Sequence, residues 1–140
     1  MTNKSGVKRT EERDFAFKML YAGEFNLDSW RLRIEHSDAN PALKSTEYVQ
    51  KIALVYEEHK EEFDALISNK LKNWDLKRVA VIDKVILRLA LAEIYYFDEI
   101  PPEVSINEAI ELGKKYSTER SGKFINGVLD AIYQSLDKKK

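Results

Sequence analysis

The chain has 140 residues, of which 44% are apolar and 34% are charged, and its formal net charge is −1. A chain of this length buries a little under about 70% of its unfolded surface in one core, so we expect a single domain. The absence of cysteine excludes disulfides, thiolate metal sites and thiol nucleophiles, and it fits a reducing cytoplasm.

The N-terminal residues are polar and basic. We expect residues 1–9 to form a flexible arm in front of a helical domain that spans residues 10–140. Lys8 and Arg9 carry positive charge in this arm, which has no acidic residue. Apolar residues at helical spacing then predict the first helix, which begins near Thr10.

The next part of the chain has a weaker pattern. A short second helix is expected around Trp30, before a less regular stretch that runs through Asn40 and Pro41. From Ser45 to Leu71, apolar residues at helical spacing predict either two amphipathic helices or one bent helix.

The stretch from Leu76 to Phe97 predicts the most buried helix of the domain. Most of its residues are apolar, but Asp83, Lys84 and Arg88 each cost about 2.5 to 3.5 kcal/mol at the centre of a bilayer. We therefore predict a buried helix and no membrane span. Lys84 and Arg88 are expected to mark its narrow solvent-facing edge.

Two prolines, Pro101 and Pro102, end this helix because they remove backbone donors and restrict the preceding residue. Ser105 and Glu108 have the spacing of a capping box, so the next helix is predicted to begin at Ser105. A polar break over residues 117–122 follows that helix.

The dipeptide Asn126-Gly127 is typical of a hairpin turn, but its flanks repeat apolar residues at helical spacing and do not alternate. We therefore predict that the last helix runs through Gly127, at a cost of about 1 kcal/mol relative to alanine. We expect another group to approach the backbone of Gly127 closely, because a side chain is absent there. A neighbouring helix and a ligand such as a nucleotide both remain open.

Few side chains could support catalysis, and we predict a non-catalytic protein without metal or cofactor. His36 and His59 lack the spacing of metal ligands and are expected to be surface histidines. The Gly122-Lys123 dipeptide looks like the end of a phosphate loop, but Phe124 replaces the hydroxyl that would bind magnesium. The phosphate-loop interpretation is therefore excluded.

A binding site is better supported. Lys123, Phe124 and Asn126 place a cation, an aromatic ring and an amide within four residues, which is the chemistry that single-stranded RNA requires. Alternatively, Phe124 begins the core stripe, Lys123 lies in water and Asn126 caps locally. The two basic regions of the chain could converge into one positive patch.

Several segments resemble the bacterial NusB family of transcription antitermination factors, and together they cover most of the chain. They are Arg13–Tyr21, Trp74, Val81–Ala90, Val104–Leu112 and Lys123–Asp130. The resemblance implies an all-α, NusB-like bundle of about six to seven helices. It also implies binding of boxA-type single-stranded RNA in rRNA transcripts, together with the ribosomal protein NusE, within the RNA polymerase antitermination complex.

The resemblance assigns RNA binding to the basic arm and to the start of the last helix. The implied residues are Lys8, Arg9, Arg13, Lys123, Phe124 and Asn126. If the four cations each neutralise one phosphate, the logarithm of the affinity should fall with the logarithm of salt at a slope of about −3. The family has a dense arginine cluster here, whereas in this chain Glu11 and Glu12 lie between Arg9 and Arg13. Weaker or differently placed phosphate contacts are therefore expected.

The resemblance also assigns Asp83 to the interface with NusE. A carboxylate among apolar neighbours is costly unless it is paired, so a bond to a nearby cap or cation is the structural alternative. Tyr21 is a second candidate for the same interface, or else a core residue whose hydroxyl is satisfied. Glu93 matches an acidic position of the family and is assigned to structure, where it would cap a neighbouring helix.

Two other functions remain open. A similar domain could serve as the RNA-binding accessory module of an rRNA cytosine methyltransferase, with catalysis on a separate subunit. The chain could also be a helical protein-interaction domain without an RNA role. The sequence does not decide between a monomer and a homodimer.

Overall fold

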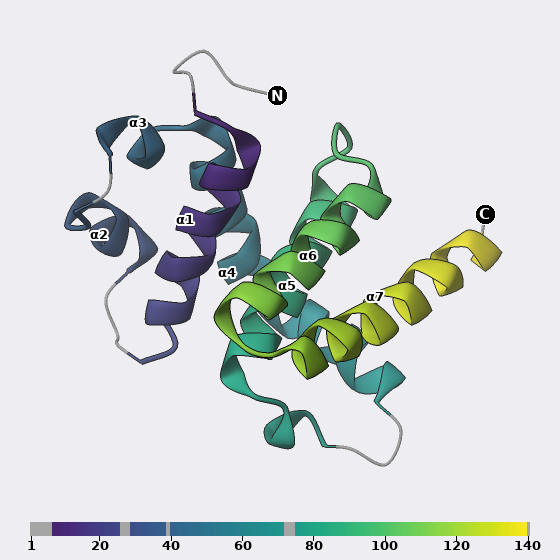
Figure 1. Cartoon of the computed structure of the whole chain (residues 1–140). Coiled ribbons are helices and arrows are strands. Elements are labelled where there is room, and N and C mark those ends of the chain that lie inside the picture. Colours follow the sequence, from purple (N-terminus) through teal and green to yellow (C-terminus); the bar gives the residue numbers. More distant parts are fainter. Residues whose placement is uncertain (1–6, 26–28, 39, 72–74, 140) are drawn as a thin grey trace.

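The computed structural model describes residues 7–25, 29–38, 40–71 and 75–139, so Trp74 lies outside the described residues. Within these ranges the chain forms seven α-helices and no strand, which confirms the predicted all-α fold (Figure 1). The helices are α1 (Arg9–Ala22), α2 (Trp30–Glu35), α3 (Pro41–Lys44), α4 (Glu47–Lys70), α5 (Val81–Tyr96), α6 (Pro102–Tyr116) and α7 (Glu119–Lys139), with a 3-10 turn at Leu76–Arg78.

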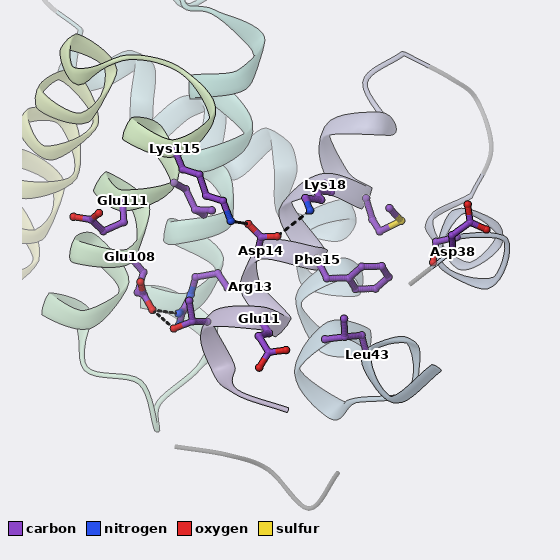
Figure 2. A pocket seen from close by; sticks show the side chains of 14 residues that line it. Glu11, Arg13, Asp14, Phe15, Lys18, Asp38, Leu43, Glu108, Glu111 and Lys115 are labelled. Carbon is purple, nitrogen blue, oxygen red and sulfur yellow. Dashed lines mark hydrogen bonds and ion pairs between the residues drawn. The ribbon is translucent and has the colours of Figure 1, made fainter. Parts of the chain in front are cut away.

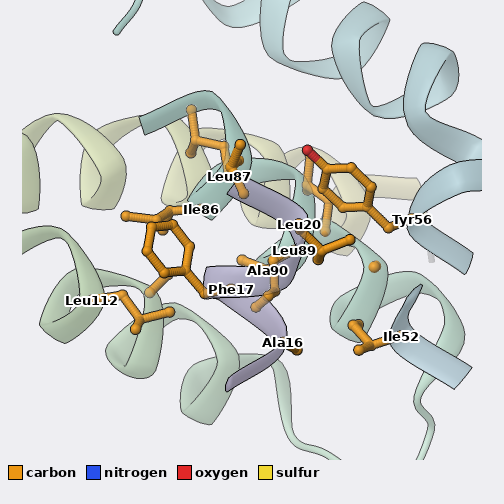
Figure 3. Packing of buried hydrophobic residues seen from close by; sticks show 14 of the residues in the cluster. Ala16, Phe17, Leu20, Ile52, Tyr56, Ile86, Leu87, Leu89, Ala90 and Leu112 are labelled. Atoms are coloured by element: carbon orange, nitrogen blue, oxygen red, sulfur yellow. The ribbon is translucent and has the colours of Figure 1, made fainter. Parts of the chain in front are cut away.

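Helix α5 is the centre of the bundle and packs against α1, α4, α6 and α7. Because it has neighbours on all sides, every residue from Val85 to Glu93 is buried, as predicted for this segment. Figure 3 shows Phe17 of α1 and Leu112 of α6 beside the apolar side chains of α5. Each large side chain buried here contributes roughly 1.5 to 3 kcal/mol, so this contact surface fixes how the helices are arranged.

The prediction that Arg88 lies on a solvent-facing edge of α5 is wrong. Its guanidinium is buried and donates to Asp64 at 2.6 and 3.0 Å, to Glu24 at 3.1 Å and to the Tyr56 hydroxyl at 3.1 Å. Two carboxylates compensate the charge, which removes the main cost of burying it. The cluster joins α5 to α4 and to the residues that follow α1.

Several helices differ in their bounds from the sequence-based expectation. Residues 41–44 form the short helix α3, where an irregular stretch was expected. Helix α6 begins at Pro102, because proline fits the first helical position, where its missing N–H is not needed. Ser105 therefore does not cap α6, and its hydroxyl donates to Glu93 at 2.8 Å.

Helices α6 and α7 pack closely because small residues meet at their contact. A Cβ placed on Gly113 would lie 2.7 Å from Ile125 Cδ1, and one on Gly122 would lie 3.1 Å from Lys114 Cγ. The predicted break over residues 117–122 is shorter than expected, and α7 begins at Glu119.

The prediction that the last helix runs through Gly127 is confirmed. A Cβ placed on Gly127 would meet no described atom within 4 Å. No helix among the described residues packs against Gly127, so helix packing within the chain does not explain why a glycine is present there.

Candidate nucleic-acid interface

The first two turns of α7 present the three groups that the sequence analysis singled out. Lys123 and Asn126 are exposed, and neither side chain has a hydrogen bond or ion pair with any residue that the structure describes. Asn126 therefore has no local capping role there. Phe124 is half-buried against the core, whereas its neighbour Ile125 is fully buried. Part of the aromatic ring thus remains open beside a cation and an amide.

The start of α7 is held in place by a hydroxyl cap. The Thr118 hydroxyl accepts the backbone N–H of Ser121 at 3.0 Å, which satisfies one of the free donors of the first turn. The Ser121 hydroxyl in turn donates to Asp83 Oδ2 of α5 at 3.2 Å. The turn that carries Lys123 and Phe124 is therefore fixed to the central helix.

The basic arm enters α1 directly. Lys8 precedes the first helical residue and is exposed, and its backbone N–H donates to Glu11 at 3.4 Å. Arg9 is the first residue of α1, with its guanidinium carbon 4.7 Å from the centre of the Tyr48 ring and its Nε 3.3 Å from Glu12. The Arg9 side chain is 35% exposed, so the structure leaves it partly accessible to an anion.

Arg13 is placed differently from the two arm cations. It is only 2% exposed, and its guanidinium donates to Glu93 at 2.6 and 3.0 Å. It also donates to Glu108 at 2.8 Å (Figure 2). Burial disfavours the charge, but the hydrogen bonds and charge of Glu93 and the charge of Glu108 outweigh that effect and raise the pKa of Arg13. Arg13 therefore ties α1 to α5 and α6, and its guanidinium does not face solvent.

Glu93 is the acceptor at the centre of this network. It is fully buried and also accepts from the hydroxyls of Tyr48 and Ser105. The carboxylate thus joins α1, α4, α5 and α6 through side chains. It does not cap the end of a neighbouring helix, contrary to the expectation from the sequence. Its structural assignment from the sequence agrees with this arrangement.

Lys8 and Arg9 lie on one flank of helix α6, and Lys123 lies on the opposite flank. On one flank, the Thr10 hydroxyl donates to Glu108 at 2.8 Å, which places α1. On the other flank, Tyr133 of α7 donates to Glu103 at 2.8 Å. The exposed strip of α6 between them includes Glu111, whose side chain is 69% exposed. The structure therefore separates Lys8 and Arg9 from Lys123 by the width of a helix, roughly 10 Å or more.

Asp83 lies in the first turn of α5 and is 7% exposed. Its Oδ2 atom accepts from Ser121, while its buried Oδ1 atom has no hydrogen-bond partner among the described residues. Burial raises the pKa of Asp83, and the hydrogen bond from Ser121 offsets part of that effect. The partner of this carboxylate is thus a helix-start hydroxyl and not a cation.

Tyr21 lies towards the same end of the bundle as Asp83, because α1 and α5 run antiparallel. Arg13 near the start of α1 contacts Glu93, whereas Glu24 just after α1 contacts Arg88, which comes earlier in α5. Its ring stacks on Phe17 at 5.9 Å and meets the edge of Phe25 at 5.1 Å. Phe25 is 66% exposed. The sequence analysis missed this exposed aromatic residue, since its position just after a helix gave no periodic signal.

A cleft of about 560 Å³ lies along α1 and was not predicted (Figure 2). Phe15, Leu43 and Leu112 supply apolar walls. Its charged groups are largely paired with each other, since Asp14 bonds to Lys115 at 2.9 Å and forms an ion pair with Lys18 at 3.2 Å. Hydrogen bonds from Tyr116, Lys115 and Lys18 lower the pKa of Asp14 despite its partial burial.

No helix in the described ranges has the length and apolarity that a bilayer crossing needs.

The NusB family profile matches residues 10–134. The chain belongs to the NusB family. The transcription antitermination protein NusB of Chloroherpeton thalassium is 39% identical to it over 136 residues, which cover 95% of this chain and 64% of that relative.

Two solved NusB structures resemble the bundle. T. maritima NusB is 36% identical, with a TM-score of 0.82 and coverage of 96% of this chain and 93% of the other. A crystal structure of the antitermination factors NusB and NusE in complex with double-stranded RNA matches at 30% identity, with a TM-score of 0.77 and coverage of 91% and 96%. The family fold is thus present over nearly the whole chain.

Proposed function

We propose that this chain is a non-catalytic transcription antitermination factor of the cytoplasm. It binds boxA-type single-stranded RNA in rRNA transcripts together with NusE, and it acts within the RNA polymerase antitermination complex. Family membership supports this function, and so does the crystal structure of related NusB and NusE proteins with RNA.

The observation that carries the proposal is the half-open ring of Phe124 between exposed Lys123 and Asn126. An unpaired base can stack on such a ring, which contributes about 1 to 3 kcal/mol per base. Lys123 supplies charge for a phosphate, and the Asn126 amide can donate to and accept from a base edge. Lys8 and Arg9 would add phosphate contacts on the far flank of α6.

Arg13 is left out of the set of phosphate contacts, because its guanidinium is committed to Glu93 and Glu108. Its proposed role is to position α1 and therefore the arm. With Lys8, Arg9 and Lys123 as the remaining cations, the expected salt slope on single-stranded RNA is about −2, and Arg13 would bring it to about −3.

Fluorescence anisotropy with a short labelled boxA RNA tests this proposal. We expect a salt slope of about −2 for the wild-type chain, and a slope closer to −1.4 for Lys123→Gln, because one contact is lost. We expect Phe124→Leu to weaken binding by about five- to a hundredfold, since leucine fills the core but cannot stack.

Arg31→Gln is the matched control, since it removes the same charge from exposed α2, on the side of the bundle opposite α7 (Figure 1). Its slope and affinity should equal those of the wild type. Unlabelled duplex RNA serves as competitor and shows whether unpaired bases are required. A slope near zero, or equal binding by Phe124→Leu, would contradict the proposed function.

NusE is proposed to bind at the end of the bundle that holds Asp83 and Tyr21. Exposed Phe25 beside Tyr21 supports an aromatic contact there, because large exposed apolar side chains favour protein interfaces. Asp83 lies nearby at the start of α5 and bonds to the first turn of α7 through Ser121. The same residue thus connects the proposed protein-binding end with the proposed RNA-binding turn.

A further inference from the structure

Gly127 differs from the other glycines that the structure describes. A Cβ on Gly23 would lie 2.5 Å from the Arg33 side chain, and those on Gly113 and Gly122 would lie 2.7 and 3.1 Å from the facing helix. Packing inside the chain therefore accounts for these three. Gly127 would meet nothing within 4 Å among the described atoms, so internal packing does not account for it.

Gly127 also lies where glycine is least favourable. It is well inside α7, which spans Glu119–Lys139, and a helix interior strongly prefers alanine to glycine. Its backbone is exposed, so the missing side chain leaves a shallow depression on the helix surface. A depression of this kind allows a ligand to approach the helix backbone about one methyl group closer than at any other residue.

The side chains around this depression match a nucleotide. The exposed residues described on α7 recur on one stripe, which consists of Glu119, Arg120, Lys123, Asn126, Gly127, Asp130 and Gln134. Lys123 lies one turn towards the helix N-terminus and Asn126 directly precedes Gly127, so a cation and an amide border the depression on that side. Half-buried Phe124 lies along the edge of the stripe.

The C-terminal side of the depression repels phosphate. Asp130 is exposed there and accepts a hydrogen bond from Gln134 at 3.0 Å, which holds its carboxylate on the stripe. A bound strand should therefore place its phosphate near Lys123 and its uncharged base or ribose over Gly127. This division of charge fits a nucleotide better than an apolar protein segment, since the stripe has no large apolar side chain.

We propose that an unpaired nucleotide of the bound RNA packs directly against the α7 backbone at Gly127, and that Gly127 thereby determines how closely the RNA approaches. This inference rests on the proposed RNA-binding function. It adds to that function a steric requirement at a residue that has no side chain of its own.

The test is Gly127→Ala, which adds one methyl group to the depression. Alanine favours the helix, so we expect the melting temperature to rise by about 2 to 4 °C. The methyl group should nevertheless weaken boxA RNA binding at least about tenfold in fluorescence anisotropy. A more stable protein that binds less RNA is an outcome that a purely structural glycine would not produce.

Ser68→Ala is the matched control, because it also replaces an exposed helical residue by alanine, but on α4 and outside this stripe, so RNA affinity should remain unchanged. If Gly127→Ala binds RNA like the wild type while Lys123→Gln binds more weakly, the inference fails and the proposed function stands. If the wild-type chain binds no RNA, both fail. If Gly127→Ala weakens binding to purified NusE and not to RNA, the stripe is a protein contact and the inference is overturned.

Discussion

Asp83 shows how one buried carboxylate can affect stability. Burial raises its pKa above the ordinary value of 3.8, so the native state holds the proton more tightly than the unfolded state. The destabilisation is small below the unfolded pKa and grows as the pH rises through the raised folded pKa. In the charged form, the buried Oδ1 atom has no hydrogen-bond partner among the described residues. The charge on Asp83 therefore lowers the stability of the fold.

Asp83→Asn should stabilise the protein at pH 7 by about 1 kcal/mol, because the amide keeps the shape and removes the buried charge. The difference from the wild type should shrink as the pH is lowered to about 4, because the raised pKa makes the folded aspartate take up its proton before the unfolded one. Urea unfolding at the two pH values measures both effects. If the proposed NusE contact uses this charge, the same variant should bind NusE more weakly, as titration calorimetry would show. If the variant and the wild type were equally stable at both pH values, the proposed effect of the buried charge would be contradicted.

Helix α1 depends on a contact that is remote in the sequence. Arg13 and Glu93 are 80 residues apart, yet their charges are the main polar link between α1 and the central helix. Removing one partner of a buried ion pair leaves the other charge uncompensated, which commonly costs about 3 to 5 kcal/mol. The pair thus controls whether α1 stays docked.

Arg13→Met should lower the free energy of unfolding by about 3 to 5 kcal/mol, measured with guanidinium chloride. The double variant Arg13→Met with Glu93→Leu should recover only part of that loss, because it removes the uncompensated Glu93 charge but leaves the buried hydroxyls of Tyr48 and Ser105 without their acceptor. Weaker RNA binding by Arg13→Met with unchanged stability would instead make Arg13 a direct phosphate contact.

The same distinction between local and remote contacts explains what the sequence could predict. Apolar periodicity predicted α1, α4, α5 and α7, because each buries a continuous stripe of its own residues. The start of α6 was misplaced, since Ser105 bonds to Glu93 on another helix and does not cap its own. Likewise, Lys123, Phe124 and Asn126 lie within four residues and were visible as a group, whereas the partners of Arg13 were not.

At the scale of the whole molecule, the proposed RNA surface is divided in two. An RNA that reaches both Lys8 and Lys123 must cross the exposed strip of α6, where Glu111 carries a negative charge. That charge repels the phosphates but is partly screened by Lys114, 3.9 Å away. The expected single positive patch is therefore interrupted between Lys8 and Lys123 by the exposed strip of α6 that carries Glu111.

Glu111→Gln should strengthen RNA binding by about two- to fivefold at low salt, and the gain should vanish at high salt, where exposed charges are screened. Glu61→Gln on α4 makes the same charge change at another exposed position and should have no such effect. Anisotropy titrations at two salt concentrations provide the comparison. Identical gains in both variants would mean that only net charge matters and that the strand does not cross α6.

The long sequence separation between α1 and its partners also has a consequence during protein synthesis. Helix α1 is made before the other helices, but Arg13 bonds to Glu93 and Glu108, and Thr10 to Glu108, which are added 80 or more residues later. Helices α5, α6 and α7 follow one another in the chain and can assemble as soon as they appear. Helix α1 therefore cannot complete its packing until α5 and α6 have emerged, and the nascent chain must keep part of its apolar face soluble until then.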